Sequence, residues 1–135
     1  MDGKVAAVLG AGPGLGVAIA QRFAREDFAV ALMARREESL SVVREEIEGA
    51  GGTALAISAD AADPTSVGRA FDEVREKLRD PEVFVYNAGN FQMGGILELT
   101  PEQFDDCFRV NCSGPCLTPS TNISSPPEPS GGPKR

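Results

Sequence analysis

Four glycines follow the first apolar run of the chain, at positions 10, 12, 14 and 16 of the stretch VLGAGPGLGVAIA. Because glycine has no Cβ, a loop of this kind lets a phosphate group approach the backbone amides at the start of a helix. Secretory signals and flexible linkers can also be rich in glycine and small apolar residues. A strand-like run before the glycines and a helical pattern after them favour the phosphate loop.

Three of these glycines have separate expected roles. Gly10 permits the tight turn, Gly14 lets a phosphate approach the backbone, and Gly16 lets the helix pack closely on the strand. Leu15, which lies between the last two, is a further candidate for cofactor binding. A P-loop is excluded because no lysine follows the glycines. The stretch therefore predicts a nucleotide-binding turn.

Apolar runs and amphipathic stretches alternate over the part of the chain that must position this turn. Near-continuous apolar runs lie at 5–9, 28–33, 54–58 and 83–86, which is typical of strands buried on both faces of a parallel sheet. Helical spacing follows each run, with the apolar residues Leu15, Ile19 and Phe23, then Leu40, Val43 and Ile47, then Val67, Ala70, Phe71, Val74 and Leu78. Gly49 or Gly51 can end the second of these helices.

Two helix starts carry clear capping residues. Asp63 followed by Pro64 predicts an N-cap with proline in the first helical position. Thr100 and Gln103 have the spacing of a capping box, so a fourth helix is expected to begin there. Phe104, Phe108 and Cys107 are expected on its core-facing side.

The alternation of strands and helices predicts an α/β fold, a Rossmann-like doubly wound parallel sheet with strand order 3-2-1-4. This cofactor-binding domain is expected to occupy residues 1–117 and to be truncated after four strands. Residues 118–135 are rich in Pro, Ser, Thr and Gly and are predicted to be a disordered tail. The fourth strand would then be an open apolar edge, which predicts self-association.

Composition limits the classes of binding partner and the cellular compartment that we expect for this protein. A net charge of −7 argues against nucleic acid or an anionic membrane as the main partner. No apolar run has the length of a membrane span. Three cysteines and the absence of histidine argue against a disulfide framework and against a metal site. We expect buried or partly buried thiols and a cytoplasmic protein.

The glycine spacing at 10, 14 and 16 resembles that of the short-chain dehydrogenase/reductase family, and further motifs support the resemblance over residues 3 to about 117. The segment YNAG (86–89) is similar to the family's N-N-A-G, and VNCSG contains Asn111 where the family has a catalytic asparagine. The resemblance implies that Asp60, with Ala61 beside it, contacts the adenine ring. It also implies that Asn87, Ala88 and Gly89 line the cofactor.

Three departures from the family pattern bear on activity. Leu9 stands where the family usually has threonine, and Tyr86 replaces the first asparagine of N-N-A-G. The chain also ends before the family's catalytic serine and Tyr-x-x-x-Lys. The resemblance therefore implies a Rossmann domain with Asn111 as its one catalytic candidate.

The end of the second strand indicates which dinucleotide is preferred. An acidic residue there usually binds the 2′-hydroxyl of NAD, whereas a 2′-phosphate needs a cation. Ala34 lies near the acidic position, and Arg35 and Arg36 follow it. Since the planar arginine side chain suits phosphate, NADP(H) is expected in preference to NAD(H). The alternative is that both arginines belong only to a solvated helix face.

Two hypotheses about function remain. In the first, the chain is a truncated NADP(H)-dependent oxidoreductase, whose full-length relative transfers hydride to or from an unknown small carbonyl or alcohol substrate. In the second, it is a catalytically inactive module that binds a nucleotide or a partner chain. A Rossmann-like domain for another adenine nucleotide is a third possibility, which the Asn-Ala-Gly motif disfavours.

Overall fold

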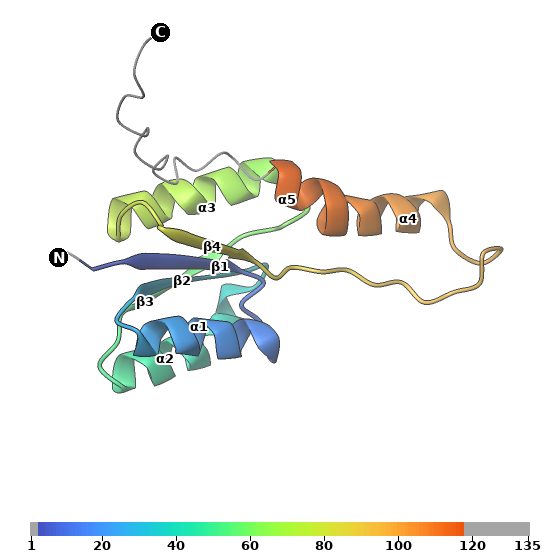
Figure 1. Ribbon diagram of the computed structural model, residues 1–135. Coiled ribbons are helices and arrows are strands. Elements are labelled where there is room, and N and C mark those ends of the chain that lie inside the picture. Colours follow the sequence, from blue (N-terminus) through green and yellow to red (C-terminus); the bar gives the residue numbers. More distant parts are fainter. Residues whose placement is uncertain (1–2, 118–135) are drawn as a thin grey trace, which may run out of the picture.

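A computed structural model describes residues 3–117 of the protein. Its four strands form one parallel sheet of order β3-β2-β1-β4, with helices on both faces (Figure 1). The strands are β1 (Val5–Leu9), β2 (Ala29–Ala34), β3 (Ala54–Ser58) and β4 (Val83–Tyr86). The predicted fold class and strand order are confirmed, and β2 lies one residue later than its apolar run.

Helices connect the strands and continue beyond the last one. They are α1 (Leu15–Arg25), α2 (Ser41–Gly49) after a 3₁₀ turn η1 (Glu37–Leu40), α3 (Pro64–Lys77) and α4 (Pro101–Phe108). A π-helical turn η2 (Arg109–Ser113) leads from α4 into α5 (Gly114–Leu117). Figure 1 shows α1 and α2 on one face of the sheet and α3 on the other.

Both predicted N-caps are present. The Asp63 side chain accepts a hydrogen bond from the Thr65 amide at 2.9 Å, and Pro64 is the first residue of α3. The capping box of α4 is complete, because Thr100 Oγ1 accepts from the Gln103 amide while Gln103 Oε1 accepts from the Thr100 amide. Each cap satisfies amides that a helix start leaves without partners.

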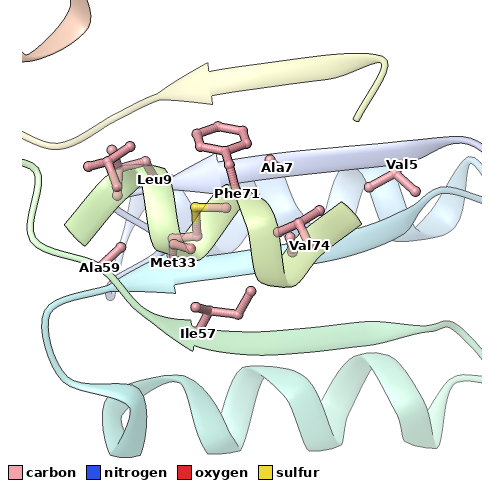
Figure 2. Close-up of a cluster of buried hydrophobic side chains, with 11 residues drawn as sticks. Val5, Ala7, Leu9, Met33, Ile57, Ala59, Phe71 and Val74 are labelled. Atoms are coloured by element: carbon pink, nitrogen blue, oxygen red, sulfur yellow. The ribbon is translucent and has the colours of Figure 1, made fainter. Parts of the chain in front are cut away.

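Two hydrophobic clusters lie on opposite faces of the sheet. The α3 face contains Val5, Ala7, Leu9, Ala31, Met33, Ile57, Ala59, Val67, Ala70, Phe71 and Val74 (Figure 2). The face of α1 and α2 contains Val8, Ala11, Ala20, Val30, Leu32, Leu40, Val43, Ile47, Ala54 and Ala56. Because β1 and β2 lie in the middle of the sheet, their residues are packed from both sides, as their unbroken apolar runs predict.

The packed face of α1 includes the predicted Ile19 and Phe23, which are partly buried against the core, but not the predicted Leu15. Leu15 is 66% exposed, while Gly16 and Ala20 are the buried residues of this helix. A helix advances about 100° per residue, so burying positions 16 and 20 turns position 15 toward solvent. The close approach of helix and strand at Gly16 therefore decides which face of α1 packs on the sheet. The large apolar side chain of Leu15, next to Gly16, has no part in the core.

The expected packing of α4 is wrong. Phe104 is 65% exposed and Phe108 is 52% exposed, and their rings stack on each other with centroids 6.3 Å apart. The sheet of the described residues ends at β4, and α4 extends away from it (Figure 1). Among the thiols, only Cys107 is half-buried, and Cys112 and Cys116 are exposed, contrary to the expectation of buried or partly buried cysteines.

The strand β4 is the least buried of the four. Its four residues are all half-buried, whereas burial on both faces was expected. Within residues 3–117 it pairs with β1 and with no second strand, so one edge of its backbone is open. The predicted tail at 118–135 lies outside the described residues. None of the described helices has the length and apolar character needed to cross a bilayer.

Candidate functional site

A groove of about 600 Å³ lies at the carboxyl ends of the four parallel strands. Ligands of open α/β sheets bind at this edge, where the loops that follow neighbouring strands meet. The groove brings together seven predicted residues, which are Gly10, Arg35, Asp60, Ala61, Asn87, Ala88 and Gly89. Residues from four separate loops thus share one surface.

The other five predicted residues do not line this groove. Gly14 and Leu15 directly follow its wall residue Pro13, and Gly16 is buried in the first turn of α1. Arg36 is exposed at the start of η1, and Asn111 lies in η2. The groove has further lining residues that sequence reasoning did not assign to it, namely Leu9, Gly12, Pro13, Ala34, Ala59, Ala62, Asn90, Asp106, Arg109 and Val110.

Part of this larger set could have been found from the sequence. Gly12 and Pro13 belong to the glycine-rich stretch, and Asn90 directly follows the Asn-Ala-Gly motif. No local pattern marks Asp106 or Arg109, because their place beside the groove depends on how α4 and η2 lie against the strand ends.

The glycines of the first turn divide into two pairs. A Cβ on Gly10, whose φ is +89°, would lie 2.5–2.7 Å from backbone atoms of Asn87 and Ala88. A Cβ on Gly16 would collide with the carbonyl oxygen of Gly10. By contrast, a Cβ on Gly12 or Gly14 would meet nothing within 4 Å. Gly10 and Gly16 thus allow close packing, whereas Gly12 and Gly14 leave the backbone open to a ligand, as expected for a phosphate-binding turn.

The Asn-Ala-Gly segment holds the glycine loop in place. The Asn87 amide donates a hydrogen bond to the Leu9 carbonyl at 2.7 Å, and its side-chain Nδ2 donates to the Gly10 carbonyl at 3.0 Å. This side chain therefore bonds the end of β4 to the turn after β1. Its role in the described structure is to shape the groove wall.

The segment after β3 is fixed by its own polar groups. Asp60 Oδ1 accepts a hydrogen bond from the Ala62 amide at 2.9 Å, and the Asp60 amide donates to Ser66 Oγ at 3.0 Å. Ser58 Oγ donates to the Arg35 carbonyl at 3.1 Å. The loops that carry Arg35 and Asp60 are thereby joined at the groove edge.

Asn111 connects η2 to the loop after β4. Its Nδ2 donates to the Asn90 carbonyl at 2.6 Å, while its Oδ1 accepts from the Asn90 amide at 2.9 Å. Both polar groups of the side chain are thus bonded to one residue beside the groove. The asparagine singled out by the family resemblance therefore joins η2 to the loop beside the groove in the described structure.

Tyr86 makes a second connection to η2. Its hydroxyl donates a hydrogen bond to the Val110 carbonyl at 2.6 Å. Burial raises the pKa of Tyr86, and the nearby negative charge of Asp60 raises it further. The phenol therefore stays protonated at neutral pH, with its proton directed at a backbone carbonyl and not into the groove.

Four charged side chains line the groove, two arginines (Arg35 and Arg109) and two aspartates (Asp60 and Asp106). No group of three or more histidine, cysteine or acidic side chains within residues 3–117 is placed to hold a metal ion. Of the groups that line the groove, the glycine backbone and the two arginines are of the kind that bind a phosphorylated nucleotide.

Comparison with known proteins identifies relatives of this chain. The chain is 37% identical over 115 residues to a versicolorin reductase of Emericella nidulans, covering 84% of this chain and 44% of the relative. A solved short-chain type dehydrogenase/reductase from Mycobacterium marinum superposes with a TM-score of 0.82 at 34% identity, covering 86% of this chain and 46% of that one.

A metagenomic short-chain oxidoreductase, solved in complex with NADP, superposes with a TM-score of 0.82 at 33% identity. The superposition covers 87% of this chain and 54% of the metagenomic protein. The chain thus spans about half the length of the proteins it matches. The family model for short chain dehydrogenases matches residues 4–125. The chain therefore belongs to the short-chain dehydrogenase/reductase family.

Proposed function

We propose that the groove binds NADP(H) in preference to NAD(H). The observation that carries this proposal is Arg35, which lines the groove directly after Ala34, the last residue of β2, so that neither position is acidic. A guanidinium at this strand end suits a 2′-phosphate, whereas a carboxylate would suit a 2′-hydroxyl. The NADP complex of a structural relative supports the same choice.

The remaining residues fit a dinucleotide. The open backbone at Gly12 and Gly14 and the amides that begin the eleven-residue helix α1 suit the phosphates. Asp60 and Ala61 suit the adenine end, and Asn87, Ala88 and Gly89 line the same groove. When bound, the cofactor would supply hydride chemistry between its nicotinamide and a carbonyl or alcohol.

The proposed activity of the whole protein is that of an NADP(H)-dependent oxidoreductase acting on a small carbonyl or alcohol compound. The family's catalytic serine and Tyr-x-x-x-Lys are not among these 135 residues. We therefore propose that this chain by itself binds the cofactor without catalysing the reaction. Its three cysteines, free in the structure, support a reducing compartment such as the cytoplasm.

Replacing Arg35 by alanine is expected to weaken NADPH binding by about 1.5–3 kcal/mol, the usual contribution of a hydrogen bond to a charged group. NADH binding should hardly change, because NADH has no 2′-phosphate. Titration of both cofactors against the purified variant, followed by nicotinamide fluorescence, measures the difference. The Arg22→Ala variant, which removes an exposed arginine of α1 outside the groove, is the control. Equal losses for the two cofactors would assign Arg35 a structural role only.

A second candidate function, that of an interaction module, is favoured by the edge of β4. The strand has no charged residue and no proline, which are the features that usually prevent edge-to-edge pairing. Large apolar side chains are also exposed in the segment that follows it, including Phe91, Met93, Ile96 and Leu97. We propose that a second copy of the chain pairs with this edge.

The Val83→Lys variant tests self-association. Val83 lies on the open edge strand and belongs to neither core cluster, so a lysine there should hinder pairing with little loss of packing. Sedimentation velocity over a range of concentrations should show dimers or larger species for the wild type and a shift toward monomer for the variant. Val42→Lys, at a position 61% exposed on α2, should leave the distribution unchanged. A monomeric wild type that melts cooperatively well above about 60 °C would contradict the proposal.

A further inference from the structure

Arg109 lies between two neighbouring hollows of the surface. It lines the groove of about 600 Å³ and also a second hollow of about 440 Å³, which is formed with the first turn of α3. The two hollows share Ala61 and Ala62 in addition to Arg109. The arginine therefore lies beside the segment that follows β3, where the adenine end of the dinucleotide is proposed to bind.

The backbone at Arg109 is held in place by the residues that follow it. The Val110 carbonyl accepts the hydrogen bond from Tyr86, and the Asn111 side chain makes both of its hydrogen bonds to Asn90. These three bonds attach η2 to the end of β4 and to the loop beyond it. The position of Arg109 beside the groove is thus fixed by the fold, although α4 itself has no buried residue.

The guanidinium of Arg109, unlike its backbone, is only weakly engaged. Within residues 3–117 its ion-pair partner is Asp106, with 3.7 Å between Nη1 and the carboxylate oxygen. The arginine side chain is 55% exposed, so the pair contributes little to stability. The nearby carboxylate still offsets part of the positive charge, which makes this arginine a poorer phosphate ligand than Arg35.

The surroundings of Arg109 suit a flat, uncharged ring. Ala61, Ala62 and Val110 are small or apolar wall residues of the same groove, and Asp60 lines it too, with a carboxylate that can accept from an amino group. Arginine is planar and stacks on aromatic rings and nucleobases through cation–π attraction. We propose that the Arg109 guanidinium stacks on the adenine ring of the bound dinucleotide. This inference rests on the proposed cofactor function.

Cofactor titrations of Arg109 variants test the stacking. Arg109→Ala is expected to weaken NADPH and NADH alike, by roughly threefold to tenfold, the fold-change that a cation–π contact of this kind corresponds to. Arg109→Lys should lose most of the same affinity, because it keeps the charge but not the planar group. AMP and nicotinamide mononucleotide, used as separate probes, should respond differently. AMP binding should weaken, and binding of the mononucleotide should not change.

Controls separate this inference from the cofactor proposal. Arg22→Ala removes a comparable exposed arginine, paired with Glu26 on α1, and should leave all four titrations unchanged. If the wild-type chain binds neither NADPH nor NADH, the proposed function itself is wrong. If it binds them but Arg109→Ala has no effect, the stacking role is wrong. A loss confined to NADPH and restored by Arg109→Lys would instead assign Arg109 to the 2′-phosphate and overturn the inference. Matching thermal melts of the variants would show that the fold is intact.

Discussion

Replacing Gly16 by alanine is expected to destabilise the domain by about 3 kcal/mol, at the upper end of the usual cost of overpacking. The new Cβ would collide with the Gly10 carbonyl oxygen and would lie 2.9 Å from the Ala11 Cα. Both obstacles are backbone atoms, so no side-chain rotation can relieve them. The helix α1 would have to move away from β1, and the packing around Ala11 and Ala20, which are both fully buried, would open.

Gly12→Ala is the matched control. A Cβ at Gly12 would meet no atom within 4 Å, so the melting temperature should stay close to that of the wild type. Gly12 lines the groove, and a methyl group there should still weaken NADPH binding. Thermal unfolding followed by circular dichroism compares the two variants. Similar melting curves for Gly16→Ala and the wild type would show that helix and strand do not need this close approach.

The 135-residue chain is expected to bind NADPH and yet to catalyse no carbonyl reduction. A positioned proton donor alone is worth about 10²–10⁴-fold in rate, and within residues 3–117 no tyrosine, histidine or lysine lines the groove to act as one. Its single tyrosine, Tyr86, donates its proton to the Val110 carbonyl and has a raised pKa. Position 90, four residues further on, is asparagine, so no Tyr-x-x-x-Lys pair exists at the one tyrosine.

Histidine and lysine could replace the tyrosine as the proton donor, and they too lead us to expect no turnover. The chain has no histidine, and its lysines are Lys4, Lys77 and Lys134. Glu73 raises the pKa of Lys77 by hydrogen bonding to it and through its negative charge, so that lysine stays protonated at neutral pH. Lys77 also lies at the last residue of α3, outside the groove. Asn111 is bonded through both polar groups to Asn90 and has no ionisable group to transfer a proton.

The absence of turnover can be measured directly. The purified chain is mixed with NADPH and a panel of ketones and aldehydes, and the absorbance of the reduced nicotinamide is followed. A full-length member of the family, assayed in parallel, shows that the panel contains a usable substrate. An NADPH-oxidising activity that co-purifies with the chain and disappears in the Asn111→Ala variant would overturn the prediction. It would also require a base that is not among the residues discussed above.

The sequence by itself determined the four strands, the starts of two helices and the order of the strands in the sheet. Unbroken apolar runs predicted β1, β3 and β4 at their observed bounds, because strands packed on both faces need apolar residues on both. Asp63, Thr100 and Gln103 predicted the starts of α3 and α4, because caps depend on residues within one turn of the helix. Glycines at fixed spacing after a strand predicted the turn that lines the groove.

Only the tertiary structure decided which apolar side chains are buried and which residues meet. Leu15 and Phe104 fit helical stripes as well as buried residues do, yet both are exposed, because burial depends on what the rest of the chain places opposite them. The bonds from Tyr86 to Val110 and from Asn111 to Asn90 join residues more than twenty positions apart. Such contacts have no local period, and they attach η2, which carries Arg109, to the end of β4 and the loop beyond it.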